Sequence, residues 1–79
     1  MITSDQIRAA RAMLRWSGKD LAARTGLGFS TLMRLESLEG VPSTHAKTLE
    51  VIENTFNKAG IEFVGSPDDG PGVRLFSKD

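Results

Sequence analysis

The sequence predicts a mainly α domain of four helices that ends in a two-stranded β-ribbon. Through the first 60 residues, apolar side chains recur at intervals of three and four, the spacing of helices with one buried face. After Gly60 the apolar residues alternate, which is the spacing of strands. We therefore divide the chain into a helical domain at 1–60 and a ribbon at 61–79, which either covers the core or forms a dimer contact.

The first helix is expected to begin at Thr3. Thr3 and Gln6 have the spacing of a capping box, and Asp5 favours a helix N-terminus. The buried stripe of this helix is expected to be Ile7, Ala10 and Leu14.

Two short helices joined by a glycine turn are expected at 19–25 and 29–37. Ser17 is a suitable N-cap for the first, and Trp16 is interpreted as a packing residue because it has hydrophobic-staple spacing to Leu21. Gly26 stands where the change of direction requires a positive φ. The residues expected at the contact are small or apolar: Leu21, Ala22, Leu32 and Leu35. This pattern is typical of a helix-turn-helix, and two helices of an ordinary bundle would also fit it.

A longer fourth helix is expected from a cap at Ser43 to about Ala59, followed by Gly60 as its terminator. Its apolar stripe would be Ala46, Leu49, Ile52, Phe56 and Ala59. Strands are expected at 61–64 and 73–76, with 65–72 as a loop too long for a tight hairpin. An isolated ribbon is marginal in water, so these strands should pack on the helices, pair with a second chain, or both.

The net charge of zero hides a division between the two halves of the chain. Residues 1–34 carry six basic and two acidic side chains, and residues 35–79 carry four basic and eight acidic ones. This division suggests a basic face toward an anionic partner, unless it is a chance division of surface charge. The chain has no cysteine, and its pattern predicts neither a signal sequence nor a membrane span, so we expect a cytoplasmic protein without disulfides.

Several short segments together resemble a known family. They are Trp16-Ser17, Asp20-Leu21-Ala22, Gly26-Leu27, Ser30-Thr31-Leu32, Leu35-Glu36 and Gly40-Val41-Pro42. Over residues 5–59 the chain resembles the Xre (Cro/cI-like) helix-turn-helix transcriptional regulators. The resemblance implies a lambda-repressor-like fold, here lacking the usual fifth helix, and a regulator, such as a repressor, that binds double-stranded DNA in a sequence-specific manner as a homodimer without a cofactor.

The resemblance also implies which residues would face DNA. The helix at about 29–37 would read the major groove, with Arg34 able to make a bidentate contact to guanine or, equally, a phosphate contact. The other implied DNA-binding residues are Ser17, Lys19, Phe29, Ser30, Thr31 and Ser37. Arg11 and Glu36 stand where the family often has a buried ion pair.

The chain departs from the family pattern at four positions. Gly18 replaces a glutamine that grips phosphate, Gly28 replaces a Ser or Thr N-cap, and Phe29 and Met33 replace polar or basic residues. These departures predict weak or shape-driven DNA binding. They also leave open an alternative, a protein-interaction module such as an antirepressor or a partner of another regulator.

Catalysis is not expected. His45 is the only histidine, no cysteine is present, and the carboxylates are scattered without metal-ligand spacing. We predict no catalytic residues, no metal site and no cofactor.

Overall fold

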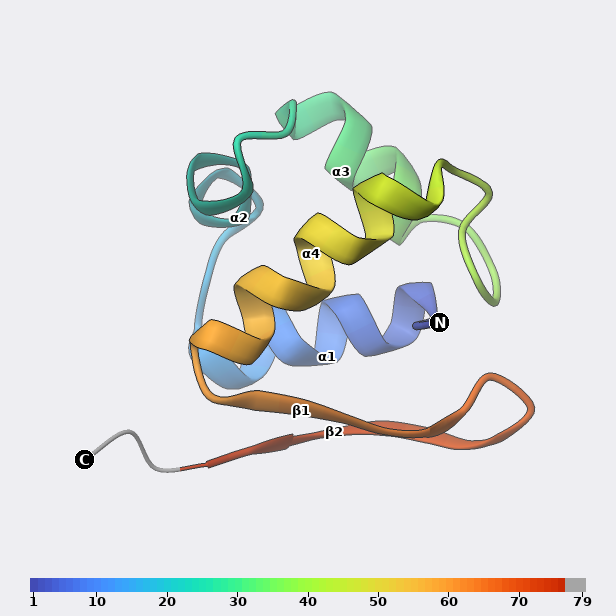
Figure 1. Cartoon of the computed structure of the whole chain (residues 1–79). Coiled ribbons are helices and arrows are strands. Elements are labelled where there is room, and N and C mark those ends of the chain that lie inside the picture. The colour runs from blue at the N-terminus through green and yellow to red at the C-terminus, as the bar shows by residue number, and fades with distance from the viewer. Residues whose placement is uncertain (77–79) are drawn as a thin grey trace.

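The computed structural model describes residues 1–76, which form four helices followed by a β-hairpin (Figure 1). The elements are α1 (Ser4–Leu14), α2 (Gly18–Thr25), α3 (Phe29–Glu36), α4 (Ala46–Lys58), β1 (Ile61–Ser66) and β2 (Asp69–Leu75). About half of the chain is helical, so the fold is mixed α and β rather than mainly α. Residues 77–79 of the predicted ribbon segment lie outside the described residues.

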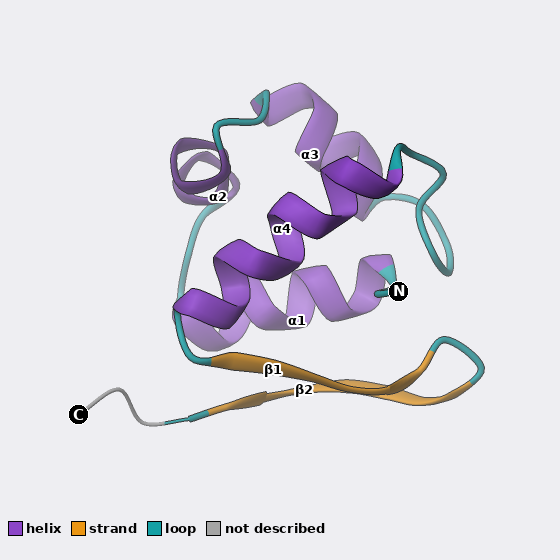
Figure 2. Cartoon of the chain, in the orientation of Figure 1, coloured by secondary structure: helices purple, strands orange, loops and turns teal. Residues whose placement is uncertain are grey.

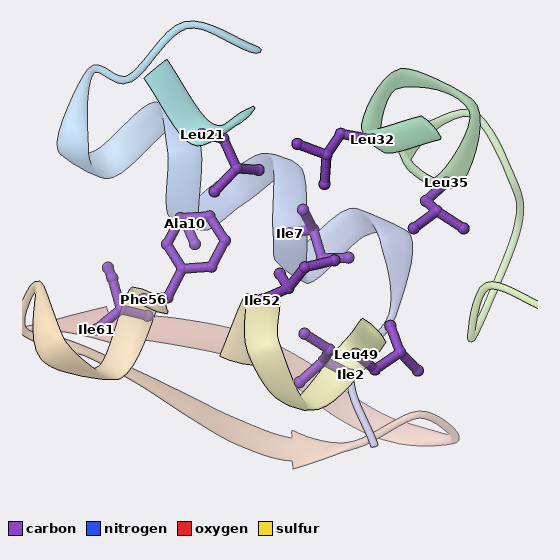
Figure 3. Packing of buried hydrophobic residues seen from close by; sticks show 10 residues of the cluster. All are labelled: Ile2, Ile7, Ala10, Leu21, Leu32, Leu35, Leu49, Ile52, Phe56 and Ile61. Atoms are coloured by element: carbon purple, nitrogen blue, oxygen red, sulfur yellow. The ribbon is translucent and has the colours of Figure 1, made fainter. Parts of the chain in front are cut away.

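The hairpin lies along one side of the helices, where β1 contacts α4 and β2 contacts α1 (Figure 2). The apolar core draws side chains from all four helices and from β1, which point toward one another in Figure 3. Its fully buried members include Ile7, Leu21, Leu32, Leu35, Ile52 and Phe56. The ribbon thus covers part of the core, as the sequence predicts for a sheet too small to be stable alone.

The start of α1 and the turn between α2 and α3 follow the sequence predictions. The capping box of Thr3 and Gln6 is present, and Ser17 forms a second one with Asp20. Gly26 adopts a φ of 77° directly after α2, a conformation that strongly favours glycine. These local signals therefore set the start of α1 and both ends of α2.

Gln6 also fastens the ribbon to α1. Its Nε2 donates to the carbonyl of Val64 at 3.0 Å and to that of Gly72 at 2.9 Å, one on each strand. Its Oε1 accepts the N–H of Thr3 at 2.8 Å. One buried amide thus caps a helix and holds both strands against it.

The predicted start of the fourth helix was wrong. His45, not Ser43, has the extended N-cap conformation, and its carbonyl accepts the N–H groups of Thr48 and Leu49. The helix therefore begins at Ala46, which is exposed in the first turn and does not belong to the buried stripe. Gly60 follows the end of the helix at a φ of 100°, as predicted.

The predicted long loop at 65–72 was also wrong, because the strands continue through most of it. Ser66 pairs with Asp69, which leaves a two-residue turn. Gly65 and Gly70 both adopt positive φ, and the register shifts between Val64 and Ser66. A Cβ at position 65 would lie 2.1 Å from the carbonyl oxygen of Gly70, so glycine permits this close approach of the two strands.

No helix among residues 1–76 is both long enough and apolar enough to span a membrane.

Candidate nucleic-acid interface

The outer face of α3 is polar. Leu32, Leu35 and Glu36 are buried on its inner side. Helical spacing places Ser30, Arg34 and Ser37 on the opposite side, and all three are exposed. Thr31, a further predicted DNA-binding residue, is only half-buried at the edge of this face. The outer face thus offers a guanidinium and hydroxyl groups to a partner.

Ser37 is less available than the sequence suggested. Its hydroxyl donates to the carbonyl of Arg34 at 2.7 Å, within the last turn of α3. A phosphate oxygen can only accept a hydrogen bond, so Ser37 would have to give up this bond to contact one. The hydroxyl of Ser17 differs, because it accepts the N–H of Asp20 at 3.0 Å and its own hydrogen remains available.

The first turn of α2 adjoins one edge of the outer face of α3. A Cβ at position 18 would lie 2.6 Å from Cε of Met33 and 2.8 Å from Cε1 of Phe29. The side chains of Phe29 and Met33 therefore occupy the space that a side chain at position 18 would need. We call this arrangement the Gly18 contact.

The Gly18 contact brings together three residues that are separate in the sequence, and it makes them one structural feature. The sequence placed Gly18, Phe29 and Met33 at separate positions and offered no signal that they meet. Glycine at position 18 presents no side chain, and Phe29 and Met33 fill the space there with apolar atoms. At position 28, glycine caps α3 without a side-chain hydrogen bond.

Lys19 is exposed in the first turn of α2, and within residues 1–76 neither Lys19 nor Arg34 forms an ion pair. Between them in sequence, the Asp20 carboxylate accepts the N–H of Ser17 at 2.8 Å, which lowers the pKa of Asp20. Lys19 and Arg34 therefore remain available to an anionic partner.

The cations of α1 are used differently. Arg11 forms a two-pronged pair with Glu36, with Nε at 2.8 Å from Oε2 and Nη2 at 2.7 Å from Oε1. This is the ion pair that the resemblance implied, and hydrogen bonding to Glu36 raises the pKa of Arg11. Arg8 donates to the backbone carbonyl of Glu36 and to Asp5. Both arginines therefore fix α3 to α1.

Trp16 is a packing residue, as predicted. Its ring stacks on that of Phe56 with 5.5 Å between the centroids, and the guanidinium of Arg24 lies 4.3 Å from the centre of its ring. The Arg24 guanidinium thus lies over the face of the indole ring, and the residue remains exposed at the end of α2.

Comparisons of this chain with protein-family models, with curated proteins and with solved structures find no match.

Proposed function

We propose that this chain is a sequence-specific regulator that binds double-stranded DNA, of the Xre (Cro/cI-like) kind. In this proposal α2, the turn at Gly26 and α3 act as a helix-turn-helix, and α3 enters the major groove. The observation that carries the proposal is the polar outer face of α3, where Ser30 and Arg34 are exposed, together with the exposed Lys19 in the first turn of α2. A groove-reading helix needs such a face, with donors free of internal partners.

The roles of the two cations differ in this proposal. Arg34 lies on the exposed outer face in the last turn of α3, where its planar guanidinium can donate two parallel hydrogen bonds to one guanine. Lys19, at the start of α2, would lie against the sugar–phosphate backbone together with the hydroxyl of Ser17. Arg34 would then contribute sequence preference, and Lys19 would contribute affinity for any duplex.

We further propose that two copies associate along β2. Phe76 N–H donates to the Gly60 carbonyl at 2.9 Å, and the antiparallel register then makes 62–74 and 64–72 the hydrogen-bonded pairs. The backbone groups of Val73 and Leu75 consequently point away from β1. An open strand edge of this kind is a template for another strand, and a second copy of β2 can supply it in an antiparallel pair.

The dimer is tested by light scattering on the intact protein and on Leu75→Lys, which places a charge on the open edge. The natural chain should be a dimer at micromolar concentrations and the variant a folded monomer. Glu62→Gln, on β1, is the control and should leave the dimer intact. A monomeric natural chain would contradict the dimer while leaving DNA binding to be judged separately.

DNA binding is tested by selecting duplexes from a random pool with the purified protein, followed by gel shifts at two salt concentrations. Enrichment of one sequence motif, with affinity that decreases as salt increases, is the expected result. Failure to retain any duplex would contradict the proposal. It would favour the protein-interaction alternative, which is consistent with the 44% exposed Phe29 beside Met33.

A further inference from the structure

Phe29 is an aromatic side chain in an unusual place. It is the first residue of α3 and is 44% exposed, whereas Phe56 in the core is fully buried. One helical turn along from Phe29 lie the buried Leu32 and the half-buried Met33, while Ser30, the next residue in sequence, is exposed on the polar outer face. Phe29 is thus a large, partly exposed apolar group at the edge of the polar outer face, and its position calls for an explanation.

The Gly18 contact holds this ring in place. Gly18 does not adopt a positive φ, so its backbone conformation would accept any residue. The restriction comes from space, because a Cβ there would approach Cε1 of Phe29 to 2.8 Å and Sδ of Met33 to 3.0 Å. Glycine at the start of α2 thus lets one edge of the ring lie against the backbone, while the rest of the ring remains exposed.

We propose that Phe29 recognises the C5-methyl group of a thymine, which would make it a specificity-determining residue. The inference rests on the proposed function and refines it. An aromatic ring cannot hydrogen-bond to a base edge, and the thymine methyl is the apolar group that base pairs display in the major groove. Cytosine at the same position carries a hydrogen at C5 in place of the methyl group, so the ring would lose this apolar contact.

In this arrangement Gly18 is a positioning residue. It contributes no side chain to the DNA contact, but it determines where the ring of Phe29 lies. A methyl group at position 18 would displace Phe29 and Met33 together. The base preference at one operator position therefore depends on a residue in the neighbouring helix.

The test uses the duplexes selected by the natural protein. Each thymine is replaced in turn with deoxyuridine, which removes one methyl group and leaves every hydrogen-bonding group unchanged. At one position in each half-site, affinity should decrease about fourfold, the amount expected for one buried methyl group. Phe29→Ala should bind the thymine and deoxyuridine duplexes equally well, and Gly18→Ala should reduce the difference between them.

Met13→Ala is the matched control, because Met13 on α1 is also 44% exposed and lies on a different helix. It should keep the full preference for thymine. Circular dichroism melting of each variant establishes that it is folded, and Phe29→Leu should retain part of the preference if Phe29→Ala does not fold.

The outcomes separate the two proposals. Specific binding with no thymine sensitive to methyl removal would overturn the role of Phe29 and leave the proposed function standing. A methyl-sensitive thymine whose effect survives in Phe29→Ala would also overturn it. If the protein retains no duplex, the proposed function fails and this inference fails with it.

Discussion

The two ends of α3 are held in different ways. At its C-terminal end, the buried Glu36 receives Arg11 through its carboxylate and Arg8 through its backbone carbonyl. At its N-terminal end, Phe29 and Met33 meet the backbone of Gly18 through apolar contact alone. The ion pair fixes the C-terminal end of α3 to α1. The apolar contact at the N-terminal end leaves part of the Phe29 side chain exposed, where a partner can contact it. The C-terminal end thus fixes α3 in the fold, and the N-terminal end provides an exposed surface for a partner.

The same contrast applies to the basic residues. The arginines of α1 at positions 8 and 11 are used within the molecule, while Lys19 and Arg34 have no ion-pair partner among residues 1–76. A count of charges along the chain cannot make this distinction. The partners that neutralise the arginines of α1 include Glu36, which is distant in sequence.

The largest expected effect is a loss of stability at the ion pair that fixes the C-terminal end of α3. Arg11→Ala leaves the buried carboxylate of Glu36 without its partner and should destabilise the fold by about 3 kcal/mol. Urea unfolding measures the loss. Lys47→Ala removes an exposed pair with Glu50 at 3.6 Å and should change stability by less than about 0.5 kcal/mol. Equal losses in the two variants would show that the Arg11 pair does not fix α3.

The next effect tests the attachment of the ribbon. Gln6→Glu keeps an acceptor for the N–H of Thr3 but removes the donor to the carbonyls of Val64 and Gly72. We expect a loss of about 2 kcal/mol at neutral pH. Burial against two carbonyl oxygens raises the pKa of the introduced carboxyl above the ordinary Glu value of about 4.3. A protonated carboxyl can donate again, so the loss should shrink as the pH falls through this raised pKa and should be smallest below about 4.3. A loss that is independent of pH would contradict the proposed role of the amide donor.

Smaller effects are expected at the surface, where stability should hardly change. Arg34→Ala should weaken binding to the selected duplex about tenfold and relax the preference at one base pair. Lys19→Ala should weaken binding to every duplex and lower the slope of log affinity against log salt by about one. Competition gel shifts measure both effects. Identical behaviour of the two variants would contradict their separate roles.

The smallest expected effect is at the cap of α2. Asp20 is ionised more readily in the folded chain because it accepts the N–H of Ser17, and its pKa lies below the ordinary value of 3.8. Its contribution to stability should therefore be complete above that pH and disappear as the pH falls through the lowered pKa. Thermal melts of Asp20→Asn should differ from those of the natural chain at neutral pH and converge with them in acid. A constant difference would contradict this sign.

Local signals in the sequence predicted the parts of the fold that depend on neighbouring residues. The capping boxes at Thr3 and Ser17 and the positive φ at Gly26 each follow from residues within one turn. The start of α4 was missed because Ser43 is a good cap by residue type, while the chain reaches the N-cap conformation only at His45. The length of the strands was underestimated because the glycines and prolines of 65–72 are typical of loops.

The parts of the candidate site that could not be predicted depend on contacts between distant elements. Gln6 fits a helix cap in sequence, and nothing nearby indicates that it also binds carbonyls 58 and 66 residues away. From the sequence alone, Gly18 is only a position that lacks a side chain. The structure adds that Phe29 and Met33 occupy the space that a side chain there would need. The pair of Arg11 and Glu36 was anticipated through the family resemblance, not from spacing.

The most direct test of the central claim is competition between duplexes at physiological salt. The natural protein is bound to a selected duplex, and a scrambled duplex of the same composition is added as competitor. If α3 reads the major groove, the selected sequence should be preferred by at least about a thousandfold, as in specific protein–DNA complexes. Equal competition by the scrambled duplex, or no binding to either, would contradict the claim.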